Sequence, residues 1–287
     1  MSKDDLSWSI PVMRAGYAGR GIVYLVVAGV SLYTVWAGGR AEGTSEALSS
    51  IRDSAWGIPV LVLIALGMLA YAVWRVVDAT YDLEDYGTDA KGIIARAGML
   101  VTGTLHLTIG ILAVIALFKL SDGGSGSGLS DAVSGVMALP AGRALVAVAG
   151  VVTIGAGFYY LHKAWKRKYR EVLASNHFTR NWDPILRAGV AAQGVIVTLI
   201  GGFITYAGLT ADPEKAGGVG EAFSWLHEQA YGQILVIAVC IGLLGFAQFC
   251  FVNATHRIIP KVTGNDIESL AKQFGDKAKR GAKTATG

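Results

Sequence analysis

Six long runs of apolar residues divide the sequence, and each is long enough to cross a lipid bilayer. About 20 apolar residues in a helix cover the ~30 Å of hydrocarbon in a membrane. Charged residues make up only 16% of the chain, against about 25% in an ordinary soluble domain. The runs are residues 14–37, 57–77, 96–120, 144–161, 187–209 and 232–252. The predicted fold class is therefore an all-α, polytopic membrane protein with six transmembrane helices.

The lysines and arginines are distributed unevenly over the connections between these runs. Twenty of the 25 lie in the N-terminal flank, the second and fourth connections and the C-terminal flank, and five lie in the first, third and fifth connections. Connections rich in Lys and Arg stay in the cytoplasm during membrane insertion. The sequence therefore predicts that both termini are cytoplasmic.

A three-residue motif, Arg-Ala-Gly, opens the first, third and fifth apolar runs. It begins at Arg14, Arg96 and Arg187, and another glycine stands seven residues after each arginine. A motif that recurs at alternate helices indicates an internal repeat. Each copy holds two helices and returns the chain to its starting side. We therefore predict three parallel two-helix repeats around a pseudo-threefold axis along the membrane normal.

A second pattern, acid-Ala-apolar-Ser, stands before the second, fourth and sixth apolar runs. It begins at Glu46, Asp131 and Glu221. These segments predict short amphipathic helices that lie on the outer surface of the membrane. The expected divisions of the chain are repeats at 11–81, 93–170 and 184–257, a glycine-serine loop at 121–128, and a basic cytoplasmic tail at 258–287.

These two patterns resemble those of a family of bacterial membrane proteins catalogued as domain of unknown function 1206, whose members carry a two-helix domain in three copies. The resemblance covers about residues 14–257, and the Arg-Ala-Gly openings with their following glycines are its markers. It implies a location in the bacterial cytoplasmic (inner) membrane, and it carries over no activity, substrate or site. The middle copy departs most, because Ile93 stands where Pro11 and Pro184 precede the arginine in the other two copies.

The three opening arginines, Arg14, Arg96 and Arg187, are the first group of candidate functional residues. Around a threefold axis they would form a cytoplasmic ring. Guanidinium groups beside the N–H groups of a helix N-terminus bind anions, including lipid phosphates. Arginines at a membrane border also anchor a helix to the headgroups or to a neighbouring helix. Both interpretations stay open.

The acids Glu46, Asp131 and Glu221 would form a matching ring at the outer end. An acid in the first turn of a helix is stabilised by the helix dipole, which gives these residues a structural explanation. Attraction of cations is the functional alternative.

The middle of the membrane holds a third group of candidates. Positions six and ten after each opening arginine share one helix face, and they hold Arg20 and Tyr24, Thr102 and His106, and Gln193 and Val197. Such a face either packs against other helices through polar contacts or lines a narrow polar path. His106 lies roughly 15 Å into the membrane, where an ionisable side chain is a functional candidate. A neutral histidine bonded to a neighbouring helix is the competing explanation.

Catalytic and metal-binding patterns are missing from the sequence. It has no phosphate loop, HExxH helix or GxSxG elbow, and no Asp or Glu stands in the middle of an apolar run. Cys240 and Cys250 are ten residues apart in one run, so they are interpreted as separate buried thiols. We predict that the protein is not an enzyme and holds no cofactor or metal.

Two functions remain after these exclusions. The first is a non-catalytic accessory or envelope component that acts through contacts with helices or lipids. Its expected partners are the bilayer, including anionic lipids drawn to the basic tail, and another membrane protein, with no nucleic acid. The alternative is a channel or carrier for a small anion or solute along the pseudo-threefold axis.

Overall fold

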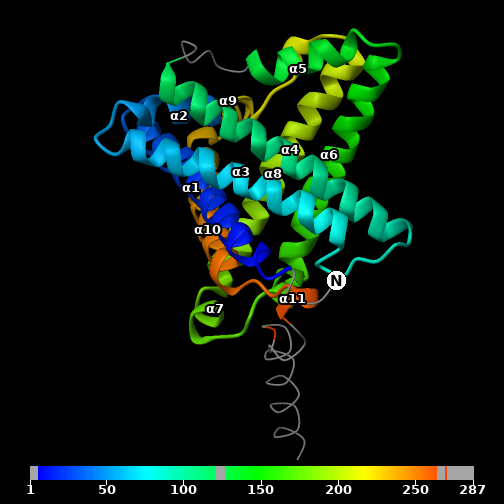
Figure 1. Cartoon of the computed structure of the whole chain (residues 1–287). Helices are drawn as coiled ribbons and strands as arrows, with labels where there is room; N and C mark the ends of the chain where they lie inside the picture. The colour runs from blue at the N-terminus through cyan, green and yellow to red at the C-terminus, as the bar shows by residue number, and fades with distance from the viewer. Residues whose placement is uncertain (1–5, 120–126, 264–268, 270–287) are drawn as a thin grey trace, which may run out of the picture.

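A computed structural model of the chain describes residues 6–119, 127–263 and 269. Six helices among these residues are long and apolar enough to cross a membrane (Figure 1). They are α1 (Ser9–Trp36), α3 (Gly57–Tyr81), α4 (Ala90–Phe118), α6 (Gly142–Trp165), α8 (Asp183–Thr210) and α10 (Gly232–His256). This part of the chain contains no β-strand. The predicted fold class is confirmed.

Short helices precede the second membrane helix of each repeat, as the acid-Ala-apolar-Ser pattern predicts. They are α2 (Thr44–Arg52), α5 (Ser127–Met137) and α9 (Val219–His227). All three lie at one end of the bundle, here named the surface-helix end (Figure 1). The opposite end, here named the terminal end, carries the start of α1 and α11 (Pro260–Thr263). The predicted loop at 121–128 and tail at 258–287 lie outside the described residues, except for 127–128, 258–263 and 269.

Local sequence determines several helix ends. The Asp89 carboxylate accepts a hydrogen bond from the Gly92 N–H at 2.9 Å and so caps the start of α4. Pro184 lies in the first turn of α8, where a missing N–H costs no hydrogen bond. Asp82 ends α3 in the left-handed conformation with φ of 51°, which aspartate tolerates better than most residues.

The connection between α6 and α8 is held against the start of α8 by polar contacts. It contains a 3₁₀ helix, η2 (Lys168–Val172), and α7 (His177–Asn181), and a second 3₁₀ helix, η3 (Pro213–Lys215), follows α8. Arg170 of η2 forms a buried ion pair with Asp183 at the start of α8, and the Tyr169 hydroxyl donates to the same carboxylate at 2.8 Å. These bonds hold the connection against α8.

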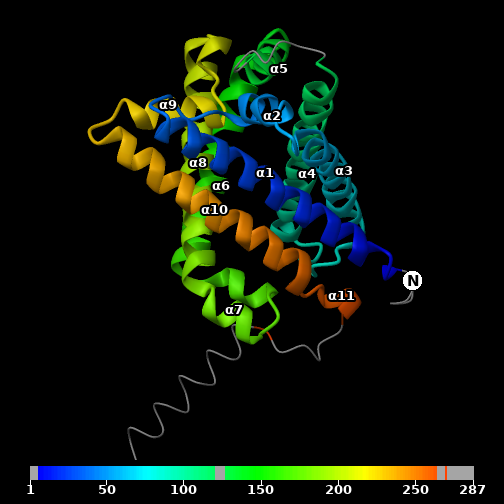
Figure 2. The same ribbon diagram turned by 90° about the vertical axis from the view of Figure 1, so that its left-hand side faces the viewer.

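The six membrane helices pack on one another both between repeats and within them, except within the middle repeat. The second helix of each repeat packs along the first helix of the next, giving the pairs α3–α4, α6–α8 and α10–α1. Within the repeats, α1 packs on α3 and α8 packs on α10, but α4 and α6 do not pack on each other. Figure 2 shows α3 with α4 on one side, α6 with α8 on the other, and α1 and α10 crossing between them. The ring of helices is therefore open at the middle repeat.

Glycines show the same difference between repeats. A Cβ added to Gly16 would lie 2.6 Å from the α3 backbone, and one added to Gly189 would lie still closer to Gly245 on α10. Such contacts allow only glycine, because the backbones themselves touch. The equivalent glycine of the middle repeat, Gly98, has no atom within 4 Å of an added Cβ, and neither has Gly155 on α6. The middle repeat therefore carries helix-packing faces that contact no helix in the described structure.

One side of α4 packs on the bundle and the other is exposed. Ala113, in the half of α4 near the surface-helix end, belongs to the main apolar cluster together with Val23, Ile64 and Leu243. Leu105, nearer the terminal end, is 58% exposed, and Phe118, at the surface-helix end, is 64% exposed. Exposed apolar side chains therefore occur in both halves of this helix.

Candidate functional site

Arg20 is a buried cation inside the bundle. It lies on α1, is 5% exposed, and its Nη1 donates to the Tyr71 hydroxyl at 3.1 Å. Its guanidinium carbon lies 5.4 Å from the ring centroid of Tyr71, 5.7 Å from that of Tyr24 and 5.1 Å from that of Phe246. Aromatic faces attract cations. Among the described residues it forms no ion pair, and its Nε has no hydrogen-bond partner.

His106 approaches the same tyrosine from α4. The ring centroids of Tyr71 and His106 are 4.6 Å apart. The Nδ1 atom of His106 lies 2.8 Å from the Thr102 carbonyl oxygen. Because a carbonyl only accepts, Nδ1 carries the proton, and Nε2 is left as an acceptor in the neutral ring. That Nε2 is buried without a partner among the described residues. The bond predicted to a neighbouring helix runs instead within α4.

Gln193 and Tyr24 complete the predicted mid-membrane set. Gln193 on α8 is 6% exposed, and its Oε1 is buried without a hydrogen-bond partner in the described structure. Tyr24 packs edge-on against Phe246, with ring centroids 4.8 Å apart. Of the residues at these positions, Tyr24 faces Arg20, and His106 contacts the tyrosine to which Arg20 donates.

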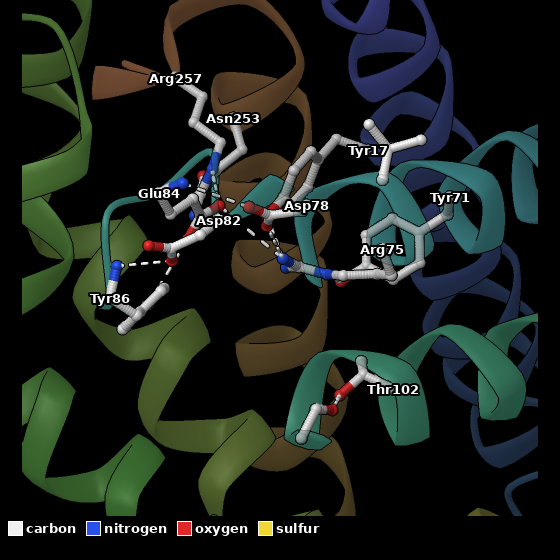
Figure 3. Close-up of polar contacts among 12 residues, drawn as sticks. Tyr17, Tyr71, Arg75, Asp78, Asp82, Glu84, Tyr86, Thr102, Asn253 and Arg257 are labelled. Carbon is white, nitrogen blue, oxygen red and sulfur yellow. Dashed lines mark hydrogen bonds and ion pairs between the residues drawn. The ribbon is translucent and has the colours of Figure 1, made fainter. Parts of the chain in front are cut away.

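Five residues form a buried cluster of charges and one amide toward the terminal end, here named the ion cluster: Arg75, Asp78, Glu84, Asn253 and Arg257 (Figure 3). Arg75 Nη1 lies 3.1 Å from Asp78 Oδ2 and 3.7 Å from Glu84 Oε1. Arg257 donates to Glu84 through Nε at 3.0 Å and to the Asn253 amide oxygen at 2.6 Å. The cluster joins α3 and the connection after it to the end of α10.

Opposite charges stabilise each other within the cluster. Burial alone would raise the pKa of Glu84, but Arg257 and Arg75 together lower it to about 2. Burial disfavours the charged form of Arg257, and the Glu84 carboxylate reverses this and raises the arginine's pKa. Each of the two arginines therefore lies within ion-pair distance of a carboxylate, and Lys163 adds a further positive charge that interacts with Glu84. Arg20 forms no ion pair with a described carboxylate.

Sequence reasoning missed the ion cluster, although a signal for it existed. The second membrane helix of each repeat begins at a glycine and carries a polar residue 21 positions later. These residues are Asp78 in α3, Lys163 in α6 and Asn253 in α10. Two of the three, Asp78 and Asn253, belong to the cluster. Glu84 could not be found this way, because it lies in a connection with no counterpart pattern in the other repeats.

The opening arginines bind helix ends. Arg96 Nε donates to the Ala79 carbonyl oxygen at 2.6 Å, and Arg187 Nε donates to the Ala164 carbonyl oxygen at 3.1 Å. These contacts lie at two separate interfaces, α3–α4 and α6–α8, and each satisfies a carbonyl at the end of the preceding repeat's helix. Arg14 is exposed on α1. The observed contacts are those of the anchoring interpretation, and the anion ring stays a prediction.

Arg187 also borders a shallow pocket of about 430 Å³ where α6 ends and α8 begins. Its lining combines apolar side chains with two arginines and an exposed tryptophan, and includes Leu161, Trp165, Arg167, Pro184, Arg187 and Ala191. Tryptophan and arginine together are typical of the level of lipid headgroups.

The acids of the surface-helix end are only partly brought together. Glu221 Oε2 accepts a hydrogen bond from the Gly218 N–H at 2.6 Å and caps α9. Burial raises the pKa of Glu46, and the negative charges of Glu221 and Glu42 raise it further. Asp131 is exposed on α5. Glu46 and Glu221 therefore interact, whereas no contact joins Asp131 to them.

The raised pKa of Glu46 predicts a pH-dependent stability. A carboxyl whose folded pKa lies above its unfolded value destabilises the fold as pH rises through the folded pKa. Glu46→Gln is therefore expected to raise the melting temperature at neutral pH and to leave it unchanged below the ordinary glutamate pKa. Thermal unfolding of the purified protein at both pH values measures this. Asp131→Asn is the control, and an equal gain for Glu46→Gln at both pH values would contradict the expectation.

Comparison with known proteins completes the description. A family model described as Domain of Unknown Function (DUF1206) matches three times, at residues 15–82, 97–167 and 188–257. A protein of Bacillus subtilis (strain 168), "Uncharacterized protein YxxB", is 25% identical over 261 residues, which cover 90% of this chain and 94% of that protein. No solved structure matches the chain. Since the three matches span most of its length and coincide with its helix pairs, the chain belongs to the family Domain of Unknown Function (DUF1206).

Proposed function

We propose that the protein is a non-catalytic component of the bacterial cytoplasmic membrane, with both termini in the cytoplasm, that binds a transmembrane helix of a partner at its middle repeat. One observation supports this most directly: α4 and α6 do not pack on each other, although the corresponding helices of the other repeats do.

The nature of the unfilled faces favours a helix as the partner. Gly16 and Gly189 bury the same motif position against a helix, while Gly98 contacts nothing. Val101 on α4 is 60% exposed and Val152 on α6 is 66% exposed. Small residues beside apolar ones allow two membrane helices to approach closely. A face that accepts a helix in two repeats is suited to accept one in the third.

Photo-crosslinking in native membranes tests this proposal. A photoreactive residue at Val152 is expected to give a discrete protein adduct, because a partner helix lies beside it. The same residue at Leu66, which is 60% exposed on α3 and lies outside the middle repeat, is the control. Gly98→Leu on α4 fills the space beside the motif glycine, so it should abolish the Val152 adduct without lowering the melting temperature. Adducts with α4 of the same chain, or with lipid alone, would contradict the proposal.

A small-anion carrier is the second candidate, and the buried Arg20 is the observation that favours it. Against it, the half of the bundle near the surface-helix end is filled by the main apolar cluster, including Val27 and Ile64. We expect proteoliposomes to show no anion flux above that of empty liposomes, with Arg96→Ala as the comparison variant. A flux that is lost in Arg20→Gln would favour the carrier instead.

A further inference from the structure

We propose that Arg20 anchors a binding site for an oxyanion, a phosphate or carboxylate group, inside the helix bundle. The proposal goes beyond the lateral binding of a helix, because it concerns the buried side of α1 and not the exposed faces of α4 and α6.

The first argument is the balance of charge. Arg75 and Arg257 each lie within ion-pair distance of a carboxylate in the ion cluster. Arg20 is as deeply buried, yet its described contacts are with Tyr71, Tyr24 and the ring of Phe246, and none of these is a carboxylate. An arginine inside a membrane bundle is costly unless it is paired with an opposite charge, and such residues mark ligand pathways and counter-ion sites. The missing partner of Arg20 is a negative charge.

The second argument is that the fold does not require a cation at this place. Arg20 stands six residues after the opening arginine of its repeat, and Thr102 and Gln193 hold the equivalent positions in the other two repeats. Both of these are neutral. A charge that only one of three similar repeats carries is explained by what it binds more readily than by helix packing.

The third argument is that unused hydrogen-bonding groups surround Tyr71. The Tyr71 hydroxyl oxygen accepts hydrogen bonds from Arg20 Nη1 at 3.1 Å and from Arg75 Nε at 3.0 Å. A hydroxyl has two acceptor positions and one proton. Because both acceptor positions of Tyr71 are used, its hydroxyl can still donate one hydrogen bond. Arg20 Nε is a second donor, without a partner in the described structure. Two such donors suit the oxygens of a single oxyanion.

An acceptor without a partner refines the class of ligand. His106 Nε2 is buried and unpartnered among the described residues, and the His106 ring lies tilted beside that of Tyr71, with centroids 4.6 Å apart. A ligand that carries a hydroxyl as well as the negative charge would satisfy an acceptor of this kind. Hydrogen phosphate has both groups, and so has the glycerol headgroup of an anionic phospholipid.

The experiment uses the purified full-length protein and compares the wild type with Arg20→Gln, Arg20→Lys and Tyr71→Phe. Arg40→Gln is the control, because Arg40 is an exposed arginine in the connection that follows α1. Melting temperatures are measured in detergent with inorganic phosphate or acetate against chloride of equal ionic strength. They are also measured in nanodiscs of phosphatidylglycerol against phosphatidylcholine, with native mass spectrometry of retained lipid.

We expect a response to one of these probes that weakens at least about tenfold in Arg20→Gln, since a charge-assisted hydrogen bond is lost. Arg20→Lys should keep part of the response, and Arg40→Gln all of it. A response to phosphate or acetate identifies a free oxyanion, and one confined to phosphatidylglycerol identifies a lipid headgroup. Without ligand, Arg20→Gln should melt no lower than the wild type, because an unpaired buried charge is removed.

The opposite pattern would overturn the proposal. If the wild type responds to none of the probes, or if Arg40→Gln loses as much of the response as Arg20→Gln, no oxyanion is held at Arg20. A lower melting temperature of ligand-free Arg20→Gln would give Arg20 a structural role through Tyr71 and the aromatic rings. Tyr71→Phe distinguishes ligand binding from this structural role, because it removes the hydroxyl that would donate to a ligand and leaves the ring that Arg20 faces.

Discussion

Replacement of Glu84 by glutamine is expected to destabilise the protein by about 3–5 kcal/mol, the usual cost of breaking a buried ion pair from one side. The carboxylate faces Arg257 and Arg75, and its side chain is 5% exposed. Glutamine has nearly the same size, so the loss comes from charge and not from packing. Arg75 would keep its ion pair with Asp78, and Arg257 would have no carboxylate within ion-pair distance among the described residues. Denaturant unfolding of the purified protein in detergent measures the change.

A second variant separates the ion pair from its environment. Removing both partners, as in Glu84→Leu with Arg257→Met, is expected to cost less than either single change, because no unpaired charge stays buried. The exposed pair of Arg52 and Asp53, whose Asp53 side chain is 77% exposed, is the control, and Asp53→Asn should change stability by less than about 1 kcal/mol. Additive losses in the double variant would show that the ion cluster does not act as a unit.

The same residue predicts sensitivity to acid. The pKa of Glu84 is lowered to about 2 by its arginines, so the unfolded chain binds a proton more readily than the folded one below the ordinary glutamate pKa. The stability that Glu84 contributes is therefore present above that ordinary value and is lost as pH falls toward the folded value. Glu84→Gln should remove this part of the acid dependence.

Alanine in place of the motif glycine is expected to lower the stability of the protein in the first and third repeats and not in the middle one. Gly16→Ala and Gly189→Ala place a Cβ against the backbone of a neighbouring helix, so the helices must move apart, at a cost of about 1–3 kcal/mol or more. Gly98→Ala meets no atom within 4 Å, and alanine is favoured over glycine in a helix by up to about 1 kcal/mol. Gly98→Ala should therefore be neutral or stabilising.

Melting temperatures of the three purified variants test this directly, because each changes the same position of the same motif. Gly155→Ala on α6, another glycine with open space around it, is a further control and should behave like Gly98→Ala. An equal loss in all three motif variants would mean that α4 and α6 close on each other in solution. The proposed binding of a partner helix would then lose its main support.

Much of the candidate site could be read from spacing. The positions six and ten after each opening arginine select Arg20, Tyr24, His106 and Gln193 from the sequence alone. Their environments could not be read in the same way. Tyr71, which contacts both Arg20 and His106, comes from another helix, and nothing in the local sequence connects the two segments.

The sequence by itself determined the elements and their order. Helix length, apolar composition and repeated motifs are local properties, and a helix in a membrane satisfies its own backbone hydrogen bonds. For this reason the six spans, the three repeats and the short surface helices follow from the residues alone, and the side of the membrane that each end faces stays a prediction from charge.

Only the tertiary structure decided which faces meet. The motif that begins at Arg96 matches the other two, yet Gly98 stays uncovered because α4 packs on α3 and α6 packs on α8 instead of on each other. Glu84 and Arg257 are 173 residues apart in the chain and meet in one ion pair. Contacts of this kind depend on competition among all the helices for the same neighbours, and no single segment encodes the outcome.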